Sequence, residues 1–324
     1  MNAIEVKDLN KSYKNGVKAL NNFNLKVKEG EIFSLLGENG AGKSTLIKIL
    51  TTYLEADSGS IKIFDENINK NPIAIRSNIA CVAQQISIDT HLSLEENMIF
   101  QSRLYKVPKD IAINRMDKLI DSFGLKEYRS YPVSSYSGGV KRRLDIALNM
   151  MSNPKILFLD EPTVGMDIKS RMAMWDMIKT IRSDFNTTIF LTTHYLEEAD
   201  ILSDSICIMK DGKEIITGTP LELRSFLGKD TLKISFSKGD KAKKYIEELK
   251  KIYPKTQVFL KENKVLIDTD DGKFDLNRTT RFLIDNDILF NGIEIGKPSL
   301  EDVFLKLTDK DLEVNNNGYY DYTL

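Results

Sequence analysis

The segment from Gly37 to Thr45 has the residue types and the spacing needed to hold a chain of phosphates. It matches the pattern G-x-x-x-x-G-K-[S/T], whose glycines let consecutive backbone N–H groups turn toward an anion. Lys43 could reach the β- and γ-phosphates of a nucleotide, and the Ser44 hydroxyl could hold Mg²⁺. The residues expected to form this phosphate site are Gly37, Glu38, Asn39, Gly40, Ala41, Gly42, Lys43, Ser44 and Thr45.

Two carboxylates, Asp160 and Glu161, follow an apolar run at residues 156–159. Such a run predicts a parallel strand that is buried on both faces. Paired acids at its end are costly unless a cation or a reaction uses them. Asp160 fits a ligand of Mg²⁺, directly or through water, and Glu161 fits the base that polarises an attacking water. The alternative is a charged strand end at the surface.

Three further side chains could serve the same chemistry. Gln84 follows the apolar strand predicted at 79–83 and could ligate Mg²⁺ or orient a water. His194 follows the strand predicted at 188–193, at the end where open α/β sheets place their ligands, although a lone histidine is more often structural. Tyr13 could stack on an adenine ring, or it could be an ordinary exposed tyrosine.

A second glycine-bearing stretch, Ser137-Gly138-Gly139, opens a predicted helix. Ser137 is a natural N-cap, and the two glycines beside a helix N-terminus could also form a second anion site. Asp167 precedes another helix, which we expect from Ser170 to about Arg182.

Alternating strands and helices must position these residues, so the pattern predicts an α/β fold. A buried strand at 32–36 leads into the phosphate loop and a helix at 44–50 follows it. A capping box at Ser93 and Glu96 opens a helix that runs to about Lys106. Pro108 and Gly124 bracket a further helix. Half-exposed strands are expected at 4–6, 23–27 and 61–64.

The composition limits the possible classes of protein. At 324 residues, with 41% hydrophobic and 29% charged residues, the chain reads as a globular protein of two domains. Its formal net charge of −1 gives no electrostatic case for a nucleic-acid partner. We expect no signal peptide and no membrane-spanning stretch. Cys81 and Cys207 read as small buried hydrophobes in a reducing compartment.

Together these motifs resemble those of ATP-binding-cassette (ABC) proteins, specifically the nucleotide-binding subunits of exporters. Tyr136 and Val140 stand where the family signature usually has Leu and Gln, and Gln85 leaves a one-residue alternative for the Q-loop. The matching residues are Tyr13 as the adenine-stacking aromatic, Gly37 to Thr45 as the phosphate loop, Gln84 in the Q-loop, Tyr136 to Val140 as the signature, Ile156 to Glu161 as the acidic strand, Asp167 in the D-loop and His194 as the switch histidine.

The resemblance implies a P-loop NTPase fold of the ABC ATPase type over residues 1–228. This fold combines a RecA-like core, an antiparallel β subdomain and a helical signature subdomain. The implied activity is ATP hydrolysis with ATP and Mg²⁺. Catalytic roles fall to Glu161, His194 and Gln84, and metal contacts to Ser44, Gln84 and Asp160. The signature residues implied to close over ATP bound to the opposite subunit are Tyr136, Ser137, Gly138 and Gly139.

The resemblance also implies partners and a location. A second cassette, expected to be a copy of this chain, would share two ATP molecules with the first. An integral membrane permease on a separate chain would be moved by the dimer, which places the chain on the cytoplasmic face of the cell membrane. The permease would contact residues 86–88 and the helix of Leu94, Met98 and Leu104, although these residues could equally be plain helical core.

The motifs that could bind phosphate all precede the capped helix at Thr219 to Glu222. Strands are expected at 231–236, 256–260, 264–268 and 288–295, and helices at 240–253 and 274–284. This βαββαβ order predicts a small ferredoxin-like domain over 229–310. The closing helix, Ser299 to Leu305, resembles the C-terminal segment of drug- and antibiotic-exporting cassettes. We expect the tail at 311–324 to be disordered.

Two other kinds of cassette remain as alternatives. Cassettes of translation or DNA repair usually carry two phosphate loops in one chain or long coiled-coil insertions, whereas this chain has one such loop and no heptad run. An importer motor is the other alternative, and the closing helix favours export over import.

Overall fold

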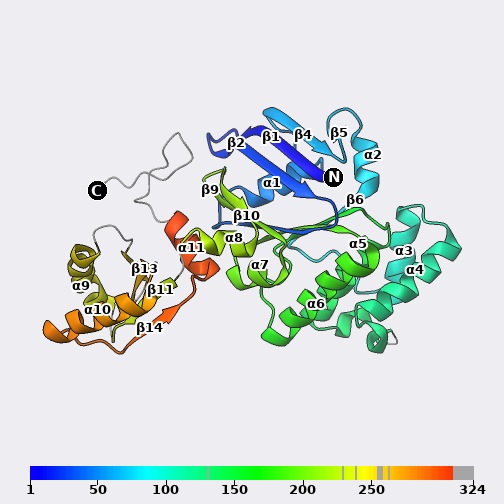
Figure 1. Cartoon of the computed structure of the whole chain (residues 1–324). Helices are drawn as coiled ribbons and strands as arrows, with labels where there is room; N and C mark the ends of the chain where they lie inside the picture. The colour runs from blue at the N-terminus through cyan, green and yellow to red at the C-terminus, as the bar shows by residue number, and fades with distance from the viewer. Residues whose placement is uncertain (130, 228–229, 238, 254–257, 262, 309–324) are drawn as a thin grey trace. The chain divides into compact units, whose positions relative to one another are not determined.

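The computed structural model describes residues 1–129, 131–227, 230–237, 239–253, 258–261 and 263–308 (Figure 1). The chain divides into two compact units, Met1–Thr217 and Gly218–Leu324. The domain limits expected from the sequence, with a boundary at residue 228, stay a prediction. The tail expected to be disordered, 311–324, and the first two residues of the strand expected at 256 lie outside the described residues.

A six-stranded sheet forms the centre of the first unit. Its strand order is β10-β9-β3-β8-β7-β6, and the pairs β9/β3, β3/β8, β8/β7 and β7/β6 are parallel. The apolar runs are buried on both faces, as predicted, and Phe33 and Phe158 each lie 5.4 Å from the ring of Phe190. The strands are β3 (Ile32–Leu36), β6 (Ile79–Val82), β7 (Ile156–Asp160), β8 (Thr188–Thr193), β9 (Ser205–Lys210) and β10 (Lys213–Gly218).

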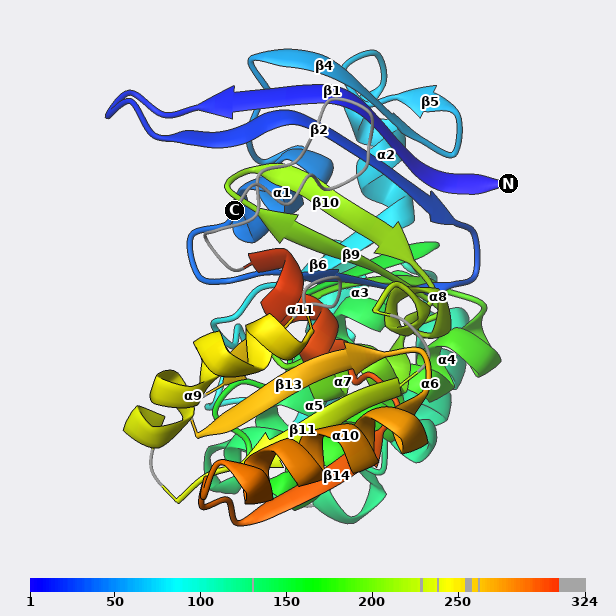
Figure 2. The same ribbon diagram turned by 60° about the vertical axis from the view of Figure 1, so that its left-hand side comes forward.

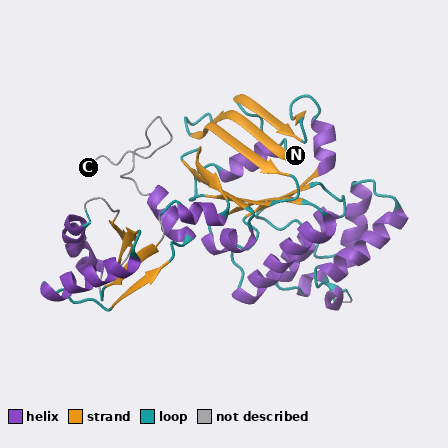
Figure 3. Cartoon of the chain, in the orientation of Figure 1, coloured by secondary structure: helices purple, strands orange, loops and turns teal. Residues whose placement is uncertain are grey.

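An antiparallel sheet with the order β2-β1-β4-β5 covers one side of the core. Its buried side chains share a hydrophobic cluster with α1 (Lys43–Leu50), which lies between the two sheets (Figure 3). This sandwich fixes the helix at the end of the phosphate loop. The strands are β1 (Asn2–Ser12), β2 (Lys18–Lys28), β4 (Ser58–Ile63) and β5 (Glu66–Asn67).

Helices and the remaining core lie on the other side of the central sheet (Figure 3). The capping box at Ser93 and Glu96 is formed, with both hydrogen bonds present. Asp167 caps α6, which is longer than the expected helix from Ser170 to about Arg182. The helices on this side are α3 (Leu94–Leu104), α4 (Lys109–Ser122), η1 (Lys126–Tyr128), η2 (Val133–Ser135), α5 (Gly138–Met150), α6 (Ile168–Phe185) and α7 (Leu196–Leu202). Helix α2 (Pro72–Asn78) lies on the side of the antiparallel sheet, where Ile75 joins its hydrophobic cluster.

The second unit contains a four-stranded antiparallel sheet with the order β12-β13-β11-β14. Strands β11, β13 and β14 lie side by side in Figure 2. The element order confirms the predicted βαββαβ arrangement. The elements are α8 (Pro220–Ser225), β11 (Asp230–Ser235), α9 (Gly239–Ile252), β12 (Val258–Lys261), β13 (Lys264–Thr269), α10 (Gly272–Asp285), β14 (Gly292–Gly296) and α11 (Leu300–Thr308).

Two expectations from the sequence need correction. The last strand begins at Gly292 and not at Ile288, because Ile288 packs into the core of the second unit just after α10. Cys81 is only partly buried, whereas Cys207 is fully buried. Burial raises the pKa of the Cys81 thiol to about 11, so it remains a neutral thiol at physiological pH. Across the described parts of the chain, every helix is too short or too polar to cross a bilayer.

Candidate functional site

The loop between β3 and α1 requires glycine at specific positions. A Cβ on Gly37 would lie 2.6 Å from the Met209 carbonyl oxygen. A Cβ on Gly42 would lie 2.3 Å from the Ala19 carbonyl oxygen, and its φ of +113° is also one that other residues rarely adopt. The backbone can therefore turn tightly here only without side chains, which brings its N–H groups to the start of α1.

Lys43 occupies the centre of this loop. Its side chain is 5% exposed, and its Nζ donates hydrogen bonds to the carbonyl oxygens of Gly37 at 2.7 Å and Glu38 at 3.1 Å. Desolvation lowers the pKa of Lys43, and the charges of Glu161 and Asp160 oppose this effect. A buried cation held among carbonyl oxygens near two acids is well placed to meet a phosphate.

The two acids at the end of β7 are held by one residue of β8. Thr192 Oγ1 donates a hydrogen bond to Asp160 Oδ1 at 2.6 Å. The Glu161 N–H points at both oxygens of Thr192, with 3.1 Å to the carbonyl oxygen and 3.1 Å to Oγ1. Glu161 has a φ of +47°, so the chain turns sharply immediately after the strand.

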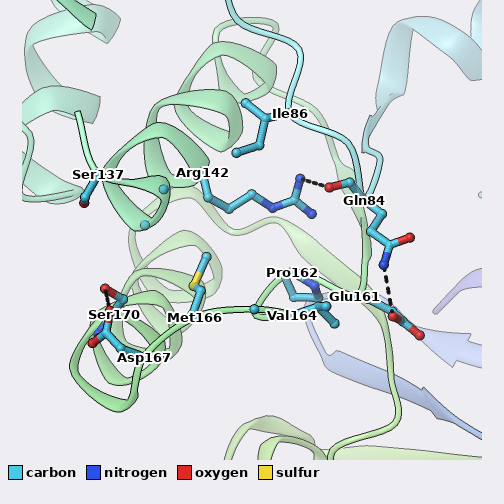
Figure 4. A pocket seen from close by; sticks show the side chains of 13 residues that line it. Gln84, Ile86, Ser137, Arg142, Glu161, Pro162, Val164, Met166, Asp167 and Ser170 are labelled. Carbon is cyan, nitrogen blue, oxygen red and sulfur yellow. Dashed lines mark hydrogen bonds between the residues drawn. The ribbon is translucent and has the colours of Figure 1, made fainter. Parts of the chain in front are cut away.

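Side chains from three other segments converge on the Glu161 carboxylate. Gln84 Nε2 lies 3.5 Å from Oε2, and His194 Nδ1 lies 3.3 Å from Oε1. Lys43 Nζ lies 3.8 Å from Oε1. Figure 4 shows the contact between Gln84 and Glu161. The structure therefore brings the predicted base, the phosphate-loop lysine, the Q-loop glutamine and the switch histidine into one cluster.

A cavity of about 500 Å³ lies in front of this cluster. Its volume is in the range of small-molecule sites. Tyr13 stands at its edge, 39% exposed, with its hydroxyl 3.1 Å from Thr45 Oγ1. The cavity gathers most of the predicted nucleotide residues: Tyr13, Asn39, Gly40, Gly42, Lys43, Ser44, Thr45, Gln84, Asp160 and Glu161.

Three predicted loop residues, Gly37, Glu38 and Ala41, do not line the cavity. Gly37 and Glu38 hold Lys43 through their carbonyl oxygens, as described above. Ala41 is buried, and its carbonyl oxygen accepts a hydrogen bond from the Gly212 N–H at 2.9 Å. The carbonyl oxygens of these residues therefore support the loop through hydrogen bonds.

The cavity has the oxygen ligands that suit Mg²⁺. Ser44 offers a hydroxyl, Asp160 a carboxylate and Gln84 an amide oxygen, which points away from Glu161 in Figure 4. Mg²⁺ in nucleotide sites is usually held by one or two carboxylates together with substrate phosphates. Accordingly, the described residues contain no cluster of three or more His, Cys, Asp or Glu side chains that would bind a metal by themselves.

The signature and the D-loop line a second cavity of about 420 Å³ (Figure 4). Ser137 caps α5 by accepting a hydrogen bond from the Val140 N–H at 3.4 Å. Asp167 caps α6 and accepts hydrogen bonds from the N–H and the hydroxyl of Ser170. Ser137, Gly138, Gly139 and Asp167 therefore face a different cavity from Lys43, while Gln84 and Glu161 line both.

Tyr136, implied as a signature contact, is buried, and for Leu94 and Met98 the structure favours the helical-core alternative that the sequence left open. Tyr136 is 5% exposed and its hydroxyl donates to the Tyr128 carbonyl oxygen at 2.6 Å, so its ring stabilises the helical region. Leu94 and Met98 are fully buried because they face the helical core, which rules them out as contacts for a partner. Leu104, which is 60% exposed, is the residue of this set that a partner could reach.

Sequence reasoning missed Thr192, Arg142 and Glu198. Thr192 belongs to a buried strand that looks apolar as a whole, and Arg142 belongs to a Lys-Arg-Arg run that resembles a solvated face. Glu198 is fully buried and its Oε1 accepts hydrogen bonds from Thr163 at 2.7 Å and Trp175 at 3.1 Å. Its carboxylate ties the helix after His194 to the segment after Glu161.

Comparison with known proteins assigns the chain to a family. The family model described as ABC transporter matches residues 20–164. The daunorubicin/doxorubicin resistance ATP-binding protein DrrA of Streptomyces peucetius is 41% identical over 232 residues, which cover 72% of this chain and 70% of the relative. The doxorubicin resistance ATP-binding protein DrrA of Mycobacterium tuberculosis is 34% identical over 310 residues, covering 94% of this chain and 93% of the relative.

Solved structures agree with this assignment. CbiO1 of Clostridium perfringens, part of the ABC transporter complex cbiONQ, is 27% identical with a TM-score of 0.65, over 78% of this chain and 96% of that one. A dimeric ATP-binding cassette in a post-hydrolysis state, bound to ADP and Pi, is 26% identical with a TM-score of 0.58, over 67% of this chain and 98% of that one. The chain belongs to the ABC transporter family, as an ATP-binding and ATP-hydrolysing motor subunit of the exporter type.

Proposed function

We propose that this chain hydrolyses ATP at the cavity in front of Glu161 and, with a second copy of itself, drives a separate membrane permease. The observation that carries the proposal is the convergence of Lys43, Gln84 and His194 on the Glu161 carboxylate. One carboxylate within reach of a phosphate-binding lysine and two water-orienting side chains is the arrangement that water attack on a phosphate requires.

In the proposed reaction each residue has a defined task. The loop N–H groups and Lys43 bind the β- and γ-phosphates, and Tyr13 stacks on the adenine. Gln84 and His194 orient a water molecule against the γ-phosphorus. Glu161 accepts a proton from that water as its oxygen attacks, and the β–γ bridging oxygen leaves with ADP. Ser44, Gln84 and Asp160 would hold Mg²⁺, which would supply positive charge against the phosphates when bound.

The placement of the signature residues supports a shared site. Because Ser137, Gly138 and Gly139 face a different cavity from Lys43, we propose that they bind the ATP held by the other copy. ATP then joins the two copies, and loss of phosphate separates them and moves the permease. The dimeric relative bound to ADP and Pi supports this arrangement.

The cargo and the location follow from the relatives by inference. Both DrrA relatives are named for resistance to doxorubicin, and the Streptomyces peucetius protein also for resistance to daunorubicin, so we propose that the permease exports amphipathic drug-like molecules. The chain would then work as a peripheral subunit on the cytoplasmic face of the cell membrane. The exposed end of α3, around Leu104, is our candidate for the contact with the permease.

Nucleotide binding by the purified full-length chain tests the proposed site. Lys43→Ala should abolish tight ATP binding, measured by equilibrium titration, because the buried cation that meets the phosphates is lost. Lys48→Ala is a matched control, since Lys48 is exposed on the same helix. Retained tight binding in Lys43→Ala, or equal loss in both variants, would contradict the proposed role of the loop.

A further inference from the structure

A buried arginine at the start of α5 connects three parts of the site. Arg142 is 3% exposed, although its neighbours Lys141 and Arg143 make the run look like a solvated basic face. Its Nη1 donates hydrogen bonds to the carbonyl oxygens of Ala83 and, at 3.5 Å, Gln84 (Figure 4). Its Nη2 donates to the carbonyl oxygen of Asp160 at 3.2 Å. One guanidinium therefore holds the main chain at both Gln84 and Asp160.

Asp145, one turn further along α5, completes this arrangement. It is 2% exposed, and its Oδ2 lies 3.4 Å from Arg142 Nη1. It also accepts a hydrogen bond from the main chain of Ser87. Burial raises the pKa of Asp145, and the charge of Arg142 opposes that shift. The pair thus holds the segment from Ala83 to Ser87 at both of its ends.

The energetics argue that this pair has a role beyond stability. Burying two charges costs desolvation that their attraction does not reliably recover, and apolar residues of the same volume often stabilise a core more. The planar guanidinium can instead direct several hydrogen bonds at fixed angles, which a packed apolar side chain cannot do. Here those bonds end on the main chain of two residues whose side chains line the nucleotide cavity.

We propose that Arg142, oriented by Asp145, is a positioning residue for ATP hydrolysis. It sets the positions of Gln84 and Asp160 and makes them depend on the position of α5. The N-terminus of this helix carries Ser137, Gly138 and Gly139, so closure of the signature on a partner's ATP is transmitted through Arg142 to the metal-binding side chains. This inference rests on the proposed function, because the roles of Gln84 and Asp160 belong to it.

The neighbouring arginine provides a matched control. Arg143 Nη1 donates to the carbonyl oxygens of Phe123 at 2.9 Å and Gly124 at 3.2 Å, which follow α4 and do not line the nucleotide cavity. Arg142→Lys and Arg143→Lys each keep the charge and remove the planar fork. The full-length chain is used to measure the ATP dissociation constant, kcat, and the Mg²⁺ concentration that gives half-maximal hydrolysis.

Arg142→Lys should lower kcat by roughly 10- to 100-fold, the scale on which groups behind metal ligands act. It should raise the half-maximal Mg²⁺ concentration severalfold, because Gln84 and Asp160 are displaced. The ATP dissociation constant should stay within about twofold, because the loop around Lys43 is intact, and Arg143→Lys should change none of the three. Asp145→Asn should act in the same direction as Arg142→Lys, and it carries the test if Arg142→Lys does not fold.

Two results would overturn the inference. One is an equal effect of Arg142→Lys and Arg143→Lys on kcat and on Mg²⁺ dependence. The other is a loss of ATP affinity that follows a lower melting temperature, which would make Arg142 a purely structural residue. Failure of the proposed function is recognised separately, because the unmodified chain would then show no Mg²⁺-dependent hydrolysis of ATP.

Discussion

The hydroxyl of Thr192 donates a 2.6 Å hydrogen bond to the carboxylate of Asp160, across two neighbouring parallel strands. The same hydroxyl faces the Glu161 N–H. One threonine on β8 therefore fixes both the carboxylate that we assign to the metal and the start of the turn that presents the base. Neither acid is held by its own strand alone.

Replacing Thr192 by valine should raise the Mg²⁺ concentration that ATP hydrolysis requires. Thr192→Val keeps the shape of the side chain, but leaves Asp160 free to rotate, at a cost of about 1 kcal/mol in the free energy of unfolding. We expect a higher Mg²⁺ requirement for ATP hydrolysis, measured by metal titration, and unchanged ATP binding. Thr188→Val is the control, because Thr188 lies at the other end of β8, where its hydroxyl accepts a hydrogen bond from the Gly30 N–H. The same Mg²⁺ requirement in both variants would argue against this role.

Replacing Glu161 by glutamine should separate binding from hydrolysis. Glu161→Gln keeps the shape of the side chain and removes the group that accepts a proton. We expect ATP binding to remain and turnover to fall by roughly a hundredfold or more, which is the usual effect of losing a general base. This corresponds to about 3 kcal/mol in the activation barrier. Normal turnover, measured as phosphate release, would remove Glu161 from its assigned role.

The second unit contains a buried ion pair with a pH-dependent effect on stability. Lys306 Nζ lies 3.3 Å from Asp268 Oδ2, and both residues are less than a tenth exposed. Burial raises the pKa of Asp268 to about 6, although Lys306 opposes this shift. The folded state therefore binds the proton more tightly than the unfolded state, in which the pKa is about 4. The proton on Asp268 stabilises the folded state fully below about pH 4, and this stability is lost as the pH rises through about 6.

A comparison of melting temperatures tests this effect. Between pH 4 and pH 6, the free energy of unfolding of the unmodified chain should fall relative to that of Asp268→Asn by up to about 3 kcal/mol. Above pH 7 the difference between the two free energies of unfolding should no longer change with pH. Asp270→Asn is the control, because Asp270 is exposed. The prediction would be wrong if the free energies of unfolding of the unmodified chain and Asp268→Asn differed by the same amount at every pH. Asp268 would then not have a raised pKa in the folded chain.

The sequence predicted those parts of the site that depend on local spacing. The phosphate loop, the acids after β7 and the histidine after β8 are each recognisable within a few residues, because strand, turn and helix signals surround them. The βαββαβ order of the second unit was predictable for the same reason. The first residue of β14 was not, since the packing of Ile288 is a tertiary contact that an apolar pattern does not distinguish from a strand.

The residues that hold the site together could not be predicted in this way. Arg142 contacts Gln84 and Asp160, which are far from it in the chain, and a Lys-Arg-Arg run normally predicts solvent exposure. Thr192 and Glu198 likewise act through partners on other elements. Tyr136 matches a signature position by sequence, yet its hydroxyl binds the Tyr128 carbonyl and its ring is buried. Such roles depend on the three-dimensional contacts that the fold creates.

The central claim is that two copies of this chain bind ATP between them. The most direct test is the mass of the Glu161→Gln chain in solution, measured by sedimentation with saturating ATP and Mg²⁺ and again with ADP. We predict a dimer with ATP and a monomer with ADP, because only the triphosphate reaches Ser137, Gly138 and Gly139 of the second copy. A chain that stays monomeric with ATP, both alone and with its membrane permease, would contradict the account.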